Sequence, residues 1–258
     1  GPGHVELAGD PRKRDAGGDR FDRSEGSVPR LHPRGVNHLA LSTTDMKRQL
    51  TFWCDALGLP LKALYYMHGV AGAYHGFVEL APDSYVAFVQ HPDNTKDIEF
   101  GVSHADGPGG DVRGGTMQHV AFHVDTFDDL LAMRDRLRTK GVQVLGPIDH
   151  GFIQSIYFEG PEGLNLEVAC GSAIDPDAWI DPEVTGLCGI DADELARMRR
   201  PDEVAAAAGT VPQPVDAHPD NVRAERHPEA LARLMATPDR TVWERFSETT
   251  PPVGPADR

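Results

Sequence analysis

Two short segments, Val36-Asn37-His38-Leu39-Ala40-Leu41 and Met117-Gln118-His119-Val120-Ala121-Phe122, place a histidine at the same point of a similar pattern, 81 residues apart (119 − 38). In both, apolar residues alternate with polar or small ones, which is typical of a β-strand with one buried face. A third segment, Gly163-Leu164-Asn165-Leu166-Glu167-Val168, alternates in the same way and carries a carboxylate. These strands predict a duplicated unit that holds two histidines and one glutamate.

The residues around the two histidines repeat one order of elements. The first half predicts a strand, a helix and three more strands at 36–42, 45–57, 61–66, 76–80 and 85–90. The second half predicts the same order at 119–124, 125–141, 142–145, 155–158 and 164–169. A β-α-β-β-β unit of about 55 residues is too small to bury a core alone. We therefore expect an α+β fold in which two such units pack together and enclose a cavity.

The chain divides into three parts by composition. Residues 1–33 are rich in Gly, Pro, Arg and Asp and predict a flexible arm, in which Gly1-Pro2 is set aside as a cloning remnant. Residues 34–170 hold the two modules, at 34–92 and 115–170. Residues 171–258 predict an extension with short helices near 191–200 and 228–235, which either covers the site opening or is a surface tail. We expect Trp53 in the core and Trp179 to anchor this extension.

Composition excludes several classes of protein. The 258 residues are 40% hydrophobic and 25% charged, as in a globular protein, and the formal net charge of −15 disfavours nucleic-acid binding. No apolar run approaches the roughly 20 residues of a membrane span, and the polar N-terminus does not resemble a signal peptide. The three cysteines, Cys54, Cys170 and Cys188, form no CxxC pair, which favours a reduced, cytoplasmic protein. The sequence leaves open whether the chain forms a homo-oligomer.

Strand parity places the candidate ligands on comparable faces. Each shares its face with small or polar residues, while the other face is apolar: Ala40 and Ser42 accompany His38, Ala121 and His123 accompany His119, and Asn165 and Ala169 accompany Glu167. A single strand histidine is more often structural than a ligand, but here the position recurs in both modules. Two imidazoles and one carboxylate leave about half of an octahedral shell open, as in non-haem Fe(II) oxygenases.

The repeat also bears on the number of ligands. An alignment without gaps puts Gly72–Gln90 over Gly151–Ala169, and hence Phe88 over Glu167 (167 − 79). Phenylalanine cannot coordinate a metal. The alignment therefore favours three protein ligands over four.

Residues 148–167 read IDHGFIQSIYFEGPEGLNLE. With His150, Tyr157, a Pro-x-Gly turn and Glu167, this segment resembles the signature of the extradiol ring-cleavage dioxygenases, within the vicinal oxygen chelate superfamily. Gly160 departs from the small polar or acidic residue usual in that turn. The resemblance covers residues 34–170 and implies paired βαβββ modules that form a cupped mixed sheet around a metal site.

The resemblance implies a role for each matching residue. His38, His119 and Glu167 would bind Fe(II), with Mn(II) or another divalent metal as the alternative. His150 would lie near the bound substrate, and Tyr157 would donate a hydrogen bond to a substrate or intermediate oxygen.

Four further residues are weaker candidates. The family uses an acid–base histidine upstream of its second metal histidine, and either His104 or His91 fits that description, with His104 slightly favoured. Phe88 is expected to pack on an aromatic substrate ring. His123 and His91 are candidates for the pocket lining, although a hydrogen-bonded strand-end histidine explains His123 as well.

The implied activity is ring opening of a catechol-type aromatic diol with O₂. A catechol offers two adjacent oxygens that can chelate the metal, and a nearby histidine can accept a phenolic proton. Two alternatives remain: a divalent-metal lyase or isomerase of the glyoxalase or epimerase kind, and a binding protein of the bleomycin-resistance kind. The sequence does not identify the diol.

Overall fold

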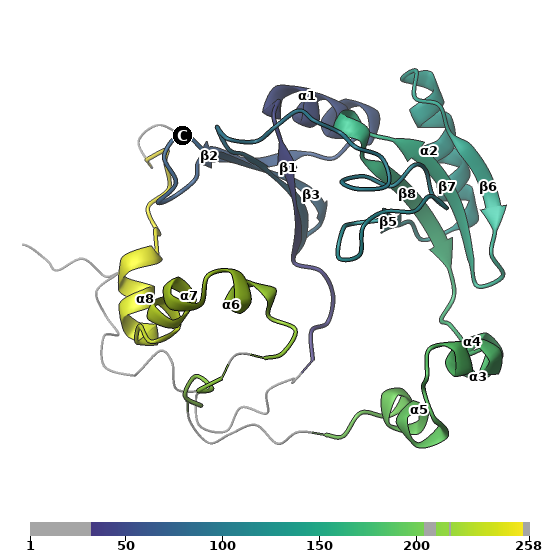
Figure 1. The fold of residues 1–258 in the computed structure, drawn as a ribbon. Helices are drawn as coiled ribbons and strands as arrows, with labels where there is room; N and C mark the ends of the chain where they lie inside the picture. The colour runs from purple at the N-terminus through teal and green to yellow at the C-terminus, as the bar shows by residue number, and fades with distance from the viewer. Residues whose placement is uncertain (1–31, 204–209, 217, 255–258) are drawn as a thin grey trace, which may run out of the picture. The chain divides into compact units, whose positions relative to one another are not determined.

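The computed structural model describes residues 32–203, 210–216 and 218–254. They belong to two compact units, one from Arg34 to Pro201 and one that contains residues 32–33 and the described residues from Asp202 onward. The first unit contains both predicted modules as two separate four-stranded sheets, joined by the segment after residue 90 (Figure 1). The α+β fold with paired modules is therefore confirmed.

The two modules have the same topology. The first consists of β1 (His38–Thr43), α1 (Met46–Thr51), η2 (Phe52–Ala56), β2 (Leu61–Tyr66), β3 (Tyr74–Ala81) and β4 (Ser84–Gln90). The second consists of β5 (Val120–His123), α2 (Phe127–Thr139), β6 (Leu145–Asp149), β7 (Ile153–Glu159), η3 (Pro161–Gly163) and β8 (Asn165–Gly171). The strand orders are β1-β4-β3-β2 and β5-β8-β7-β6. In each sheet one pair is parallel, β1 with β4 and β5 with β8, so both sheets are mixed.

Local signals explain most of these boundaries. The Asp45 side chain accepts a hydrogen bond from the first turn of α1, and Thr126 forms a capping box with Asp129 at α2. The strand predicted at 142–145 is wrong, because β6 begins only at Leu145. The Val142 N–H donates to the Leu137 carbonyl, so this segment completes the end of α2 before a strand can begin.

One buried tryptophan joins the cores of the two modules. Trp53 is fully buried, and its ring centroid lies 5.5 Å from Phe88 of the first module and 5.5 Å from Phe122 of the second. Its indole N–H donates to the buried Gln49 at 3.1 Å. The expectation that Trp53 is a core residue is confirmed, and its ring lies in the contact between the modules.

A polar contact reinforces the packing of the helices. Arg136 of α2 donates to the Ala56 carbonyl at 2.8 Å and to the Asp55 carbonyl at 2.9 Å. Lys140 forms an ion pair with the Asp55 carboxylate at 2.5 Å. These contacts connect the end of α2 to η2, which follows α1.

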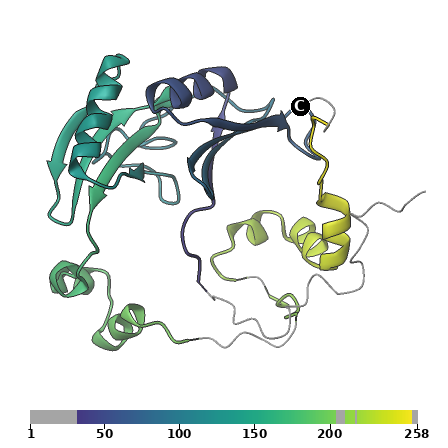
Figure 2. The ribbon, with the colours of Figure 1, turned by 180° about the vertical axis from the view of Figure 1, so that it is seen from behind.

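The chain beyond the modules is helical in part. The first unit also contains α3 (Pro176–Trp179), α4 (Pro182–Leu187) and α5 (Ala192–Arg199), and the second contains α6 (Val222–Arg226), α7 (Pro228–Met235) and α8 (Asp239–Phe246), as Figure 2 shows from behind. The helices predicted near 191–200 and 228–235 are confirmed. The Trp179 ring packs edge-on against Phe152, with centroids 4.7 Å apart, and so anchors the extension as expected.

Two expectations concern the ends of the chain and the membrane. The flexible arm predicted at 1–33 lies outside the described residues, except for residues 32 and 33. Among the helices that the structure describes, none combines the length and the apolar character that a membrane crossing requires.

Replacement of Trp53 by alanine tests the shared core. We expect Trp53→Ala to lower the free energy of unfolding by about 3–5 kcal/mol, because it empties a fully buried site. Phe127→Ala is the control, because Phe127 is 44% exposed and its loss is expected to cost about 0.5 kcal/mol. Urea unfolding of both variants measures the difference, and equal losses would contradict this account of the core.

Candidate functional site

The sheet faces opposite to α1 and α2 are called the open faces here. On the open face of the second sheet, His119 lies just before β5, and its Nε2 is 3.0 Å from Oε2 of Glu167 on β8. The strand register places Ala121, Glu167 and Tyr157 in one row across β5, β8 and β7. The parity argument for His119 and Glu167 thus agrees with the structure.

Glu167 has the environment of a metal-binding carboxylate. It is only 2% exposed. Its Oε2 faces His119, whereas its Oε1 is buried without a hydrogen-bond partner among the described residues. A buried carboxylate oxygen without a partner is costly. A cation bound at this point would remove that cost, so the carboxylate and the neighbouring imidazole fit a divalent metal.

A second histidine and a tyrosine lie beside this pair. The Tyr157 hydroxyl is 3.0 Å from His150 Nε2, and the rings of Tyr157 and His119 are 6.3 Å apart in an edge-on arrangement. Burial raises the pKa of Tyr157, and the neighbouring Glu167 carboxylate raises it further. The phenol therefore keeps its proton at neutral pH and remains a hydrogen-bond donor.

His38 lies on the open face of the other module. It begins β1, its Nδ1 is 2.8 Å from Asn37 Oδ1, and its ring contacts Phe77 edge-on at 5.7 Å. In the part of the chain that the structure describes, no three His, Cys, Asp or Glu side chains are grouped closely enough to hold a metal ion. The structure therefore brings His119 and Glu167 together but does not bring His38 to them.

The open face of the first sheet carries an aromatic cluster that the sequence analysis did not identify. Tyr65, His75, Phe77 and Tyr85 lie on β2, β3 and β4 with His38 at their edge. Tyr65 and Phe77 are stacked, with an interplanar angle of 2° and centroids 6.3 Å apart. The alternation of His75, Phe77 and Glu79 in β3 was the available signal, but it becomes informative only when the strand pairing is known.

His75 is the titratable group at the centre of this cluster. Its Nδ1 lies 3.5 Å from the Tyr65 hydroxyl, and its Nε2 is buried without a hydrogen-bond partner among the described residues. Burial lowers the pKa of His75, and the positive charge that His38 can carry lowers it further. Neutral His75 is therefore favoured in the folded protein.

The predicted position of Phe88 is wrong. Ala40 pairs with Ala87 in the first sheet, as Ala121 pairs with Glu167 in the second, so Ala87 is the counterpart of Glu167. The alignment without gaps was one residue out, and a one-residue shift moves a side chain to the opposite face. Phe88 is fully buried against Trp53 and cannot pack on a substrate. Alanine also lacks a donor atom, so the argument against a fourth ligand at this position applies to Ala87 instead.

The three remaining candidate histidines have no described contact with His119 or Glu167. His104 bonds Ser103 Oγ at 2.9 Å and lines a cavity that none of the predicted ligands lines. His91 follows β4, where its Nδ1 accepts the Asp93 N–H at 3.1 Å. His123 shares the face of His119, but its exposed ring lies 3.8 Å from Asp125. The contacts described for His104 and His91 do not include His119 or Glu167, and the acid–base role of either histidine stays a prediction.

The comparisons with known proteins define the class of this chain. The model of the glyoxalase/bleomycin resistance protein/dioxygenase superfamily matches residues 35–168, and the chain belongs to that family. Two curated relatives from Rhodococcus globerulus match parts of it. Biphenyl-2,3-diol 1,2-dioxygenase 2 is 36% identical over 61 residues, which is 24% of this chain and 32% of the relative. Biphenyl-2,3-diol 1,2-dioxygenase 3 is 31% identical over 65 residues, 25% of this chain and 34% of the relative. The chain thus matches about a third of each relative's length.

Solved structures match this chain at low similarity. A glyoxylase/bleomycin resistance protein/dioxygenase domain from Frankia sp. EAN1pec has a TM-score of 0.45 at 16% identity, covering 55% of this chain and 100% of the other. The fosfomycin resistance protein FosX from Listeria monocytogenes, complexed with Mn(II), has a TM-score of 0.37 at 14% identity, covering 55% and 95%. At these similarities the matches carry no functional assignment.

Removal of His38 tests the electrostatics of the first open face. We expect His38→Ala to raise the pKa of His75 in the metal-free protein, because the variant removes a neighbouring positive charge. His123→Ala, in the other module, is the control and leaves the pKa of His75 unchanged. NMR titration of the imidazole resonances measures both. A His75 pKa that is the same in wild type and His38→Ala would contradict the proposed coupling.

Proposed function

We propose that the chain is an extradiol-type dioxygenase that opens the ring of a catechol-type aromatic substrate with O₂ at a mononuclear Fe(II). The observation that carries this proposal is the buried Glu167, with one oxygen on His119 and the other without a partner. The adjacent His150–Tyr157 pair supports it. The names of the two partial relatives, both biphenyl-2,3-diol 1,2-dioxygenases, support the same reaction class.

Three residues would hold the metal. His119 and Glu167 are already in contact, and His38 occupies the corresponding strand position on the open face of the first module. Two imidazoles and one carboxylate suit Fe(II), with Mn(II) as the alternative. When bound, the cation would supply coordination positions for the two adjacent substrate oxygens and for O₂, and would lower the pKa of a bound hydroxyl.

The residues next to the metal site can direct protons. Tyr157 holds its proton because burial raises the pKa of its hydroxyl, so it can donate a hydrogen bond to a substrate oxygen. His150 Nε2, 3.0 Å from that hydroxyl, can accept or return a proton, and the exposed His150 ring can exchange it with solvent. This pair therefore performs the proton-handling part of the reaction.

The aromatic cluster of the first module would bind the substrate ring. Tyr65, Phe77 and Tyr85 are half-buried on the face that bears His38. Offset or edge-on packing against such rings favours an aromatic ligand. In this proposal the cluster, and not Phe88, packs against the aromatic ring of the substrate.

Metal analysis and oxygen uptake test the reaction. After anaerobic reconstitution with Fe(II), we expect about one iron per chain, oxygen uptake with catechols, and a coloured ring-opened product. His119→Ala and Glu167→Gln are expected to lose both bound iron and oxygen uptake, whereas the control His123→Ala keeps both.

Two results would contradict the proposal. Nickel, cobalt or zinc with activity that needs no oxygen would indicate a lyase or isomerase. Tight binding of an aromatic compound without metal or turnover would indicate a binding protein.

Tyr157→Phe tests the proton-handling pair separately from the metal. The variant removes only the hydroxyl, so we expect iron content to remain while kcat falls by about 10²–10⁴-fold. Tyr66→Phe is the matched control, because Tyr66 is 74% exposed on β2. Steady-state oxygen uptake and iron analysis of both variants provide the comparison, and an unchanged kcat in Tyr157→Phe would exclude the role.

A further inference from the structure

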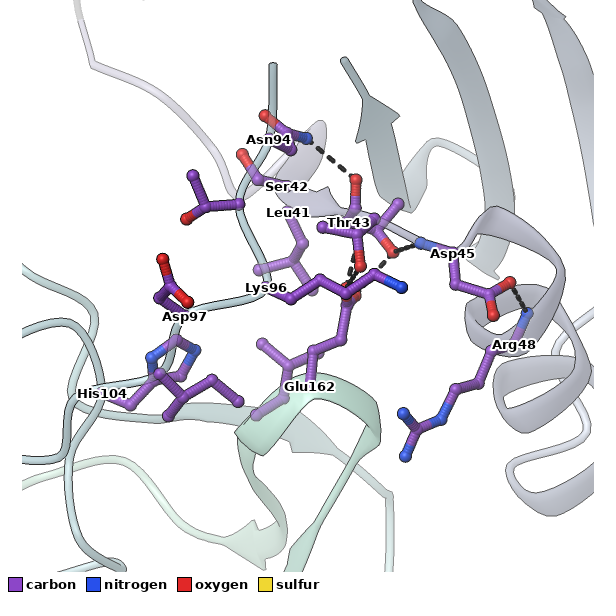
Figure 3. Close-up of a pocket in the computed structure, with 14 residues that line it drawn as sticks. Leu41, Ser42, Thr43, Asp45, Arg48, Asn94, Lys96, Asp97, His104 and Glu162 are labelled. Atoms are coloured by element: carbon purple, nitrogen blue, oxygen red, sulfur yellow. Dashed lines mark hydrogen bonds between the residues drawn. The ribbon is translucent and has the colours of Figure 1, made fainter. Parts of the chain in front are cut away.

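Glu162 is the centre of a polar contact between the modules that the proposed chemistry does not use. It lies in η3, between β7 and β8, with φ 59° and ψ 33°. Its carboxylate receives four hydrogen bonds, all from the first module: Thr44 N at 2.8 Å, Thr44 Oγ1 at 2.6 Å, Thr43 Oγ1 at 2.6 Å and Gln49 Nε2 at 2.8 Å. Figure 3 shows Glu162 reaching from the turn toward Thr43.

Two of the side chains that donate to Glu162 are buried and would lose this acceptor if the carboxylate were removed. Thr43 is 1% exposed and Gln49 is fully buried, and Gln49 also accepts the indole N–H of Trp53. Hydrogen bonds to an ionised carboxylate are stronger than neutral ones. Without the carboxylate, buried donors would remain unpaired, which costs more than the bonds themselves contribute. The contact therefore holds the end of β1 firmly against the β7–β8 turn.

The contact joins the end of β1 to the turn that precedes β8, and each of these two strands carries a proposed ligand. His38 begins β1 and Thr43 ends it. Glu162 lies three residues before Asn165, where β8 begins, and Glu167 follows on that strand. The distance between the modules at this point therefore sets where His38 lies relative to Glu167.

We propose that Glu162 is a positioning residue, which fixes the end of β1 against the β7–β8 turn and thereby sets the distance that His38 must cover to share one metal with Glu167. The metal part of this inference rests on the proposed function, whereas the placement of the two strands does not. Glu162 itself touches neither the metal nor the substrate in this proposal.

Several charged side chains line the cavity beside the Glu162 carboxylate. Glu162 lines a cavity of about 500 Å³ together with Asp45 and Arg48, near α1, and Lys96, Asp97 and His104 of the segment before β5. Burial works to raise the pKa of Glu162, but the hydrogen bonds from Thr43, Thr44 and Gln49 outweigh it and hold the pKa below the usual 4.5.

The lowered pKa of Glu162 determines how its contribution to stability depends on pH. Because the folded-state pKa is lowered, the stabilisation from Glu162 is fully present above about pH 4.5 and is lost as the pH falls through the folded-state pKa. Acid protonates the carboxylate and weakens the contact. In Glu162→Gln this part of the acid dependence is absent.

The experiment compares Glu162→Gln with two controls in the full chain. Glu159→Gln removes an exposed carboxylate from the end of β7, and Lys140→Ala breaks the separate ion pair with Asp55. The first measurement is hydrogen exchange of the metal-free protein, followed by mass spectrometry. We expect Glu162→Gln alone to lose protection in peptides that cover residues 38–51.

The second measurement is Mn(II) binding, followed by the EPR signal of free Mn(II). We expect Glu162→Gln to weaken binding by about 10–100-fold, as for other residues that orient metal ligands, while both controls bind as wild type. Urea unfolding measures the stability that each variant loses. Lys140→Ala also breaks a contact between the modules, so weaker Mn(II) binding in Glu162→Gln alone would reflect positioning and not a general loss of stability.

The outcomes distinguish this inference from the proposed function. Unchanged hydrogen exchange in Glu162→Gln would overturn the placement of β1. Lost protection with unchanged Mn(II) affinity would overturn the positioning role and leave a structural contact. If wild type binds no metal, the proposed function fails and the metal part of the inference fails with it, and hydrogen exchange alone then decides whether Glu162 places β1.

Discussion

The burial of Trp53 between two modules is the contact on which the rest of the structure depends. Each module is a four-stranded sheet with one helical segment, which offers an apolar face but not enough partner surface to cover it. The Trp53 ring contacts Phe88 on one side and Phe122 on the other, so a single side chain contributes to both cores. Once the helix-facing sides are buried in this way, the opposite faces must remain open. The candidate site occupies those faces.

The sequence predicted the elements more accurately than their pairing. The alternation around His38, His119 and Glu167 gave the correct faces, because side chains alternate in any strand. The helices at 45–57 and 125–141 and the strands at 61–66 and 85–90 were also predicted from local signals, and the structure caps these helices with Asp45 and Thr126. Pairing register depends instead on turn geometry and on contacts between distant residues. For that reason Phe88 was placed on the wrong face, and the aromatic cluster and the contacts of Glu162 were not predicted.

The family and the site contribute different kinds of information. Membership in the superfamily accounts for the paired modules, but the same fold supports dioxygenases, other metal enzymes and binding proteins. The case for metal chemistry therefore rests on the unpaired oxygen of Glu167 beside His119. The separation of His38 from that pair means that the site depends on how the two modules are held together, and not only on which residues are present.

The backbone of Glu162 carries a constraint of its own. Its φ of 59° lies in the left-handed region, which costs a residue other than glycine about 1–3 kcal/mol. Glycine would remove that cost but has no carboxylate, and asparagine tolerates the conformation but has a shorter side chain. This position therefore needs both a residue that tolerates a left-handed backbone and a carboxylate long enough to reach its donors, and few residues meet both requirements. Random mutagenesis would therefore yield few acceptable replacements here, even though the residue lies in a turn, where substitutions are ordinarily best tolerated.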